Sequence, residues 1–209
     1  YTGFTPSDNG IVGNAWYSRE EKKSVNCVED ASVKTVGTTS EYGKFSPKNL
    51  RRKTILEMVS EATGGKSISV SFKNRGAILP AGAKSNGVYW YDYTNGYFIS
   101  STHYTKTLPD WADKFNRQNI VQSYKDSVWR TLYPIDTYKK SRSDDNHFEV
   151  ALNMGKPVFP YSMKALSKEK SIYELFSFTP WANHFLLNFG MEAIVGEELG
   201  KDDQTDFIN

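Results

Sequence analysis

The chain has 209 residues, of which 38% are hydrophobic and 24% are charged. This mixture predicts a globular protein of one large or two small domains and excludes a disordered chain. The formal net charge of +2 is too small to indicate nucleic acid or a membrane surface as a partner. The sequence also contains no run of about 20 apolar residues, the length that a helix needs to cross a bilayer.

The first thirty residues are predicted to form a turn and then a β-hairpin. Asn9-Gly10 permits the positive φ that a tight turn needs. Residues 11–17 and 25–28 have the character of extended arms, and the charged segment 18–23 between them is typical of a solvated hairpin tip. Asn14 stands early on the first arm, where the residue type alone is consistent with a turn former.

A helix followed by a strand is predicted next. Ser46-Pro47 has the residue types of a helix N-cap and first position, and Gly64-Gly65 ends the helical pattern. The apolar stripe of this helix consists of Leu50, Ile55, Met58, Val59 and Ala62. The basic run 51–53 is interpreted as its solvated face. The strand 67–73 follows, and a helix followed by a strand is typical of an α/β sheet.

This strand runs directly into two cations. In a strand, Lys73 and Arg75 would lie on one face, about 6.6 to 6.8 Å apart along the backbone, before Gly76 lets the chain turn. The planar arginine fork binds two oxygens and lysine adds a mobile charge, so the pair suits a compact dianion. Ligands of α/β sheets bind beyond the carboxyl ends of strands, which places an anion site here. A solvated strand end is the alternative that the residues alone leave open.

Residues 88–92 and 97–100 predict a second hairpin, because Asn95-Gly96 is a strong turn signal. One aromatic face of this hairpin is expected to pack in the core. The other face is either further packing or a wall above the anion site that stacks a substrate ring.

The second half of the chain is predicted to carry three helices separated by loops. The helices are expected at 108–116, at 124–133 and from Trp181 to about Leu199, and the loops at 138–145 and 155–160. The last helix should pack on the sheet, with Gly190 at a close approach and Gly200 at its end.

The residues by themselves predict no metal site. The three histidines stand too far apart for a ligand motif, and the single cysteine, Cys27, is expected to be a buried thiol. The aspartates at 202, 203 and 206 fit no calcium loop.

Segments 1–16 and 71–82 together resemble the alkaline phosphatase superfamily, in particular the periplasmic alkaline phosphatases of Bacteroidetes type, which are close to nucleotide pyrophosphatase/phosphodiesterases. In that family a Thr-Pro-x-x-x-Gly-Ile-x-x-Asn run carries an asparagine that binds the phosphoryl group, and Asn14 matches it. A Lys-x-Arg pair touches the same group in the phosphatase branch, and Lys73 and Arg75 match that pair. The similarity continues, less specifically, through the blocks at 90–92, 108–111, 179–183 and 200–207.

The resemblance implies that the parent protein hydrolyses phosphate monoesters with two zinc ions and a covalent phosphothreonine. The threonine nucleophile and one metal ligand are expected before Tyr1, and the other ligands after Asn209. The chain is therefore expected to be an internal fragment, inactive alone, with no nucleophile or metal ligand of its own. Its expected partners are a small phosphate ester and the missing parts of the same polypeptide, without nucleic acid or membrane insertion. A periplasmic or secreted location follows from the resemblance only.

The fold implied is α/β: a mixed central sheet flanked by helices, with a smaller inserted α+β subdomain, incomplete in this chain. Residues 1–30 are assigned to the catalytic core, 31–178 to an inserted region carrying the Lys-x-Arg motif, and 179–209 to the return into the core. Two other functions stay open: a nucleotide pyrophosphatase/phosphodiesterase of the same superfamily, and a non-catalytic anion- or carbohydrate-binding module.

Overall fold

The computed structural model describes residues 1–152 and 155–209, which divide into two compact units. The first unit comprises residues 1–92, 97–117 and 186–209, and the second comprises residues 93–96 and 118–185. These bounds differ from the three ranges expected from the sequence, and the assignment of a catalytic core stays a prediction. No helix of the described residues is long and apolar enough to cross a membrane.

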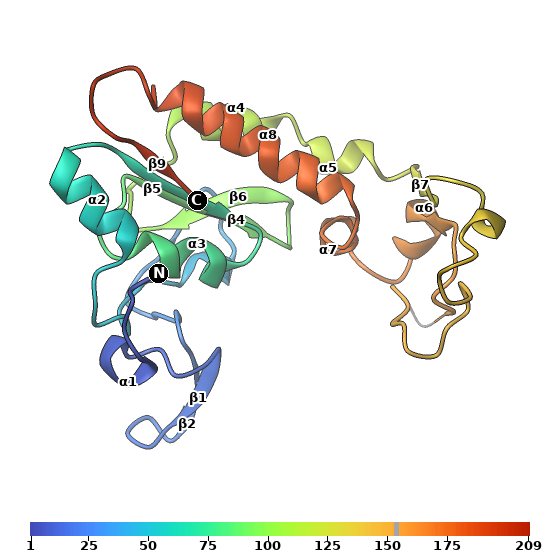
Figure 1. The fold of residues 1–209 in the computed structure, drawn as a ribbon, viewed down its shortest axis with the longest axis horizontal. Coiled ribbons are helices and arrows are strands. Elements are labelled where there is room, and N and C mark those ends of the chain that lie inside the picture. Colours follow the sequence, from blue (N-terminus) through green and yellow to red (C-terminus); the bar gives the residue numbers. More distant parts are fainter. Residues whose placement is uncertain (153–154) are drawn as a thin grey trace. The chain divides into compact units, whose positions relative to one another are not determined.

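A five-stranded mixed sheet forms the centre of the first unit, with the strand order β3-β6-β5-β4-β9 (Figure 1). The strands are β3 (Thr35–Val36), β4 (Ser67–Ser71), β5 (Gly87–Asp92), β6 (Tyr97–Ser101) and β9 (Phe207–Ile208). β4 runs parallel to β5 and β9, whereas β6 is antiparallel to β5 and β3. The predicted α/β class with a mixed central sheet is confirmed.

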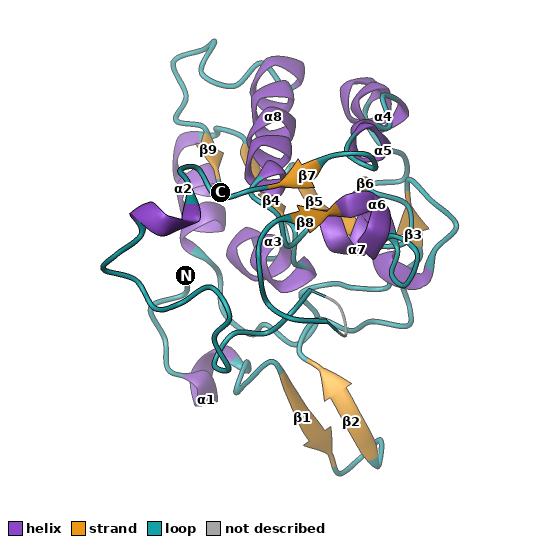
Figure 2. Ribbon diagram, turned by 90° about the vertical axis from the view of Figure 1, so that its right-hand side faces the viewer, coloured by secondary structure: helices purple, strands orange, loops and turns teal. Residues whose placement is uncertain are grey.

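Helices cover both faces of this sheet. The helices of the first unit are α1 (Pro6–Asn9), α2 (Ile55–Thr63), α3 (Asn74–Ala81), α4 (Asp110–Arg117) and, from residue 186 onward, α8 (Trp181–Gly196), of which α1 lies beside the hairpin of residues 15–26 (Figure 1). Figures 1 and 2 show α3 on one face of the sheet and this part of α8 on the other. The helices predicted at 108–116 and from Trp181 are confirmed. α8 ends earlier than predicted, and Glu198 shortly after it takes a left-handed φ of 57° that a helix cannot contain.

Strand β5 is buried on both faces, which explains its run of apolar and aromatic residues from 88 to 91, ahead of the buried Asp92. Val88 and Trp90 belong to one core cluster with Ile78 of α3, while Tyr89 meets Phe189 of α8 with ring centres 5.5 Å apart. A parallel strand covered by helices on both sides needs apolar residues at every position. The hypothesis of an aromatic wall above the anion site is therefore wrong for the β5 side chains, and the packing interpretation is confirmed.

Both predicted hairpins form. β1 (Ala15–Ser18) pairs with β2 (Lys23–Asn26) in antiparallel register. Residues 93–96 join β5 to β6, and Gly96 has the positive φ, 81°, that the Asn-Gly signal predicts.

The predicted helix beginning at Ser46 is wrong in its first half. The Ser46 hydroxyl donates to the buried carboxylate of Asp30 at 2.5 Å and so is not a helix cap. α2 begins nine residues later, behind a capping box in which Thr54 accepts from the Glu57 N–H and Glu57 accepts from the Thr54 N–H. The predicted stripe is also displaced: Ile55 is 43% exposed, while Leu56 is buried.

The second unit has its own small core of helices and aromatic rings. Its elements are α5 (Ile120–Ser123), β7 (Val128–Trp129), the 3₁₀ helix η2 (Ile135–Thr137), β8 (Tyr161–Ser162), α6 (Met163–Leu166) and α7 (Ile172–Phe176). Tyr124 stacks on Trp181 with ring centres 5.0 Å apart. The helix predicted at 124–133 is wrong, because the chain turns after α5 and then forms β7, which pairs with β8. The loops predicted at 138–145 and 155–160 are confirmed.

Gly190 lies inside α8, and the close packing predicted for it is wrong. Apart from the adjoining backbone of its own helix, a Cβ atom added at this position would meet no atom of the described residues within 4 Å. At Gly196, on the same helix, a Cβ would lie 2.3 Å from ring atoms of Trp111. The two glycines form a matched pair, one free to accept a methyl group and one not.

We expect Gly190→Ala to raise the free energy of unfolding of the 209-residue chain by about 1 kcal/mol, because alanine loses less backbone entropy in a helix. Gly196→Ala should lower the same quantity, because Trp111 must move. Urea unfolding followed by circular dichroism measures both. A loss of stability in Gly190→Ala would contradict the open environment of this position.

Candidate anion-binding site

The two cations singled out in the sequence lie at the start of α3. β4 ends at Ser71, Lys73 is the N-cap residue and Arg75 is the second residue of the helix. The Ser71 hydroxyl accepts the Lys73 N–H at 3.2 Å, and the Asn74 side chain accepts the Arg75 N–H at 2.7 Å. The prediction that both cations share one strand face is therefore wrong, because these polar side chains satisfy the backbone of a helix start.

The electrostatics of this helix start favour an anion. Amide donors at the first turn of a helix lack intrahelical partners, and the helix dipole adds positive potential there. Lys73 is exposed and Arg75 is half-buried. Within residues 1–152 and 155–209 neither side chain forms an ion pair or a hydrogen bond, since the bonds of both residues there are made by the backbone. The two cationic side chains at this helix start therefore have no counter-charge among the described residues.

The cations also lie beyond the carboxyl end of a strand, as predicted. β4 and β9 are parallel, so their carboxyl ends lie at the same edge of the sheet. Asn209, directly after β9, donates from its side chain to Ser69 at 3.0 Å and to the Gly76 carbonyl at 3.3 Å. Two strand ends and the first turn of α3 therefore meet at one place, which is the usual ligand position in α/β sheets.

Asn14 lies just before β1 and is exposed. Its carbonyl accepts the backbone N–H of Cys27 at 3.0 Å. Cys27 is only 1% exposed and belongs to the same core cluster as Ile78 of α3. Burial raises the pKa of the Cys27 thiol, and the positive charge of Arg75 acts in the opposite direction. The backbone of Asn14 and the charge of Arg75 thus both act on Cys27, whereas Lys73 has no such link among the described residues.

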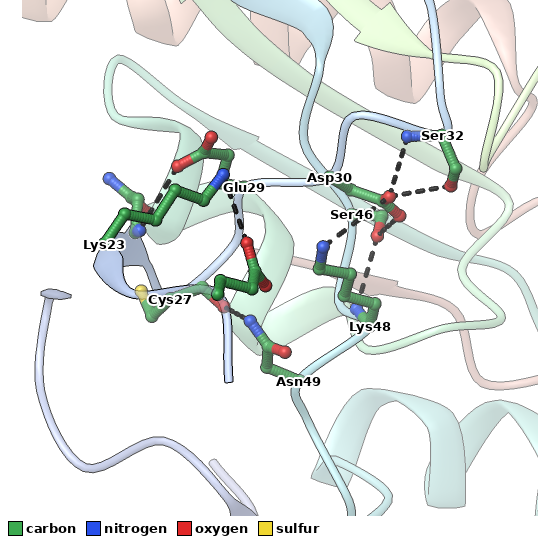
Figure 3. Close-up of polar contacts among 10 residues, drawn as sticks. Lys23, Cys27, Glu29, Asp30, Ser32, Ser46, Lys48 and Asn49 are labelled. Carbon is green, nitrogen blue, oxygen red and sulfur yellow. Dashed lines mark hydrogen bonds and ion pairs between the residues drawn. The ribbon is translucent and has the colours of Figure 1, made fainter. Parts of the chain in front are cut away.

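The loop that begins at Ser46, which was predicted to start a helix, holds the segment around Cys27 in place. The Asn49 side chain donates to the Cys27 carbonyl at 3.0 Å (Figure 3). Nearby, the carboxylate of Asp30 accepts from Ser46 at 2.5 Å and from the Ser32 hydroxyl at 2.7 Å. The signal that could have indicated this is the Asp-x-Ser sequence at 30–32, which is typical of a side chain that bonds its own backbone two residues on.

A hollow of about 600 Å³ opens beside the same segment. Val12 and Trp16, which stand on either side of Asn14 in the sequence, line it together with Asn49 and Arg51 of the loop. The residues that flank Asn14 thus line a hollow, while the Asn14 carbonyl bonds the backbone of the buried Cys27.

Metal ligands do not cluster within the part of the chain that the structure describes. Across the described part of the chain, no three His, Cys, Asp or Glu side chains lie close enough together to hold a metal ion.

A mixed sheet with an uncompensated positive helix start at its carboxyl edge defines an α/β protein with a candidate anion site. Comparison with known proteins gives the family: residues 1–163 match the type I phosphodiesterase / nucleotide pyrophosphatase family, and the chain belongs to it.

Similar proteins cover the whole chain. It is 44% identical to alkaline phosphatase PhoV of Synechococcus elongatus and 42% identical to alkaline phosphatase PafA of Elizabethkingia meningoseptica, and spans 38% and 39% of those proteins. The crystal structure of wild-type PafA superimposes with a TM-score of 0.92 at 41% identity, over all of this chain and 41% of that one. A second PafA structure with the same TM-score, at 40% identity and the same coverage, carries one threonine-to-serine change and alanine in place of one asparagine, one lysine and one arginine. The chain thus spans about two fifths of the length of these relatives.

Asp30 provides a test of how this region is held. Burial would raise the pKa of its carboxyl group, but hydrogen bonds from Ser46 and Ser32 and the charge of Lys48 outweigh burial and keep the pKa below its ordinary value. A lowered pKa in the folded state means that the ionised carboxylate stabilises the fold above the ordinary Asp pKa of about 3.9, and that this contribution is lost as the pH falls through the folded-state pKa.

We expect Asp30→Asn to lower the free energy of unfolding by about 1 to 3 kcal/mol at pH 7, because buried hydroxyl donors lose a charged acceptor. The difference from the unsubstituted chain should shrink below about pH 4. Urea unfolding at pH 7 and at acidic pH measures it, with the exposed Asp203→Asn as the control. An effect of Asp30→Asn that is the same at both pH values would contradict the ionised state assigned to Asp30.

Proposed function

We propose that this chain supplies phosphate-binding residues to a metal-dependent phosphate monoester hydrolase of alkaline phosphatase type. The observation that carries the proposal is the pair of uncompensated cations, Lys73 and Arg75, at the start of α3. The names of the relatives with 44% and 42% identity support the same activity for the full-length protein.

The proposed phosphate ligands are Asn14, Lys73 and Arg75. In the PafA variant, the replaced lysine and arginine stand two positions apart and the replaced asparagine precedes them. Lys73 and Arg75 have the same spacing here, and Asn14 precedes them. The convergence of the three side chains on one phosphoryl group is part of the proposal.

Each residue would have a separate role in phosphoryl transfer. Charge spreads over three equatorial oxygens in the transition state, and preorganised donors that meet this charge lower the barrier. The Arg75 fork can bind two oxygens, the Lys73 ammonium can follow a third, and the Asn14 amide can donate one neutral hydrogen bond.

Metal dependence belongs to the same proposal, and zinc is the metal that the family resemblance implies. A bound metal would polarise a phosphoryl oxygen or activate a nucleophile. Its ligands and the threonine nucleophile are not assigned to any of these 209 residues, and this chain alone should not turn over substrate. Export to the periplasm or beyond rests on the resemblance alone.

The pair of cations favours monoesters over diesters. A monoester dianion keeps free charged oxygens for both Lys73 and Arg75. In a diester one of these oxygens is replaced by an uncharged alkoxy group, so one cation loses its partner. The same contrast distinguishes the proposed function from a nucleotide pyrophosphatase/phosphodiesterase, which the family description also allows.

In the full-length protein, we expect Lys73→Ala or Arg75→Ala to reduce kcat/KM for an aryl phosphate monoester about a hundredfold or more, which corresponds to roughly 3 kcal/mol of transition-state stabilisation. The rate for an alkyl aryl phosphate diester should fall much less. The control is Lys84→Ala, which removes an exposed lysine that is paired with Glu61 at 3.5 Å.

An unchanged monoester rate in both variants would refute the role of the cations. A diester rate above the monoester rate in the unsubstituted protein would favour the phosphodiesterase. The absence of turnover of either substrate by the metal-loaded full-length protein would leave the anion-binding module as the function.

A further inference from the structure

We infer that Asn49 is a positioning residue that holds the backbone of Asn14 in place through Cys27. The inference rests on the proposed function of Asn14 and adds a residue that does not itself reach the phosphoryl group. Two hydrogen bonds form the connection: the Asn49 side chain donates to the Cys27 carbonyl, and the Cys27 N–H donates to the Asn14 carbonyl, each at 3.0 Å.

The same loop also fixes the residues that lead into Asn14. The Arg51 N–H donates to the Asn9 carbonyl at 2.8 Å. The carbonyl of Asn49 lies so close to Gly10 that a Cβ atom there would be 2.4 Å from it. The segment from Asn9 to Asn14 is therefore held by the loop at its beginning and, through Cys27, at its end.

Cys27 connects the segment from Asn9 to Asn14 with the helix that carries the cations. It is packed in one cluster with Ala77 and Ile78 of α3, the helix whose first turn carries Arg75. Core packing alone fixes the side chain of Cys27 but leaves its peptide groups to be oriented by hydrogen bonds. Asn49, which is partly buried and lines the hollow, orients the Cys27 peptide group by donating to its carbonyl.

The consequence for catalysis follows from how strictly a donor must be placed. A misplacement of about 1 Å can reduce a rate about a hundredfold, even when it originates outside the reacting groups. Without the Asn49 amide, the Cys27 carbonyl loses its donor and the segment that carries Asn14 gains freedom. Asn49 should then affect the transition state only as long as Asn14 is present.

A double-mutant cycle in the full-length protein tests this directly. The variants are Asn49→Leu, which keeps the size and neutrality of the side chain without its donor, Asn14→Ala, and the combination. We expect Asn49→Leu to lower kcat/KM for an aryl phosphate at least about tenfold, and the double variant to be no slower than Asn14→Ala alone. The inhibition constant of inorganic phosphate should rise in the same non-additive way.

The matched control is Asn86→Leu. Asn86 also makes one side-chain bond to the backbone, to the Ser67 N–H at 2.9 Å, but at the opposite end of β4. It should alter thermal stability and leave kcat/KM unchanged. Asn49→Gln, which retains the amide, should recover part of the rate, and Asn49→Ala replaces Asn49→Leu in the cycle if the leucine variant fails to fold.

The outcomes separate the two proposals. If Asn14→Ala lowers the rate and the effects of Asn49→Leu and Asn14→Ala multiply, or if Asn49→Leu has no effect, the positioning role is overturned and the phosphate-binding role of Asn14 stands. If Asn14→Ala itself leaves the rate unchanged, the proposed function of Asn14 fails and the positioning role falls with it.

Discussion

The packing of α3 against one face of the central sheet is the contact on which the rest of the structure depends. Ala77, Ile78 and Ala81 are completely buried in this contact. The two alanines let the helix approach closely, and burial of an isoleucine side chain contributes about 1.5 to 3 kcal/mol. Because Cys27 is part of the same cluster, this packing positions both the helix that carries the cations and the segment that carries Asn14.

Strand direction then decides what lies next to the start of that helix. β4 is parallel to β5 on one side and to β9 on the other, so three strands deliver their carboxyl ends to one edge. The contact of Asn209 with Gly76 is the local result. A sheet with β9 antiparallel would place the end of β9 at the opposite edge, and the first turn of α3 would lose this neighbour.

The sequence was sufficient for the α/β class, both hairpins and the long helix, because each rests on a local signal: a helix followed by a strand, a charged tip or an Asn-Gly turn between two extended arms, and helical spacing. It failed where polar side chains had two possible partners. Ser46 could cap a helix or bond Asp30, and Asp30 is sixteen residues away along the chain. Ser71 and Asn74 could extend a strand or start a helix, and tertiary packing of α3 selects the helix.

The site was predictable only in part for the same reason. The residue types at Lys73 and Arg75 indicated an anion, and their place beyond a strand followed from the α/β pattern. Their geometry did not follow, since a strand and a helix start project the same two residues differently. Asn49 carried no local signal at all, because its role is defined by Cys27, a residue 22 positions away.

The helix start changes what the two cations can do. In a strand, they would act as two side chains only. At the first turn of α3 they share their position with the positive end of the helix dipole, equivalent to about half a charge. Half-burial of Arg75 limits the water that can screen these charges, so they repel one another when no anion is present. A dianion would relieve this repulsion more fully than a monoanion, so the preference proposed for monoesters would arise from the backbone as well as from the side chains.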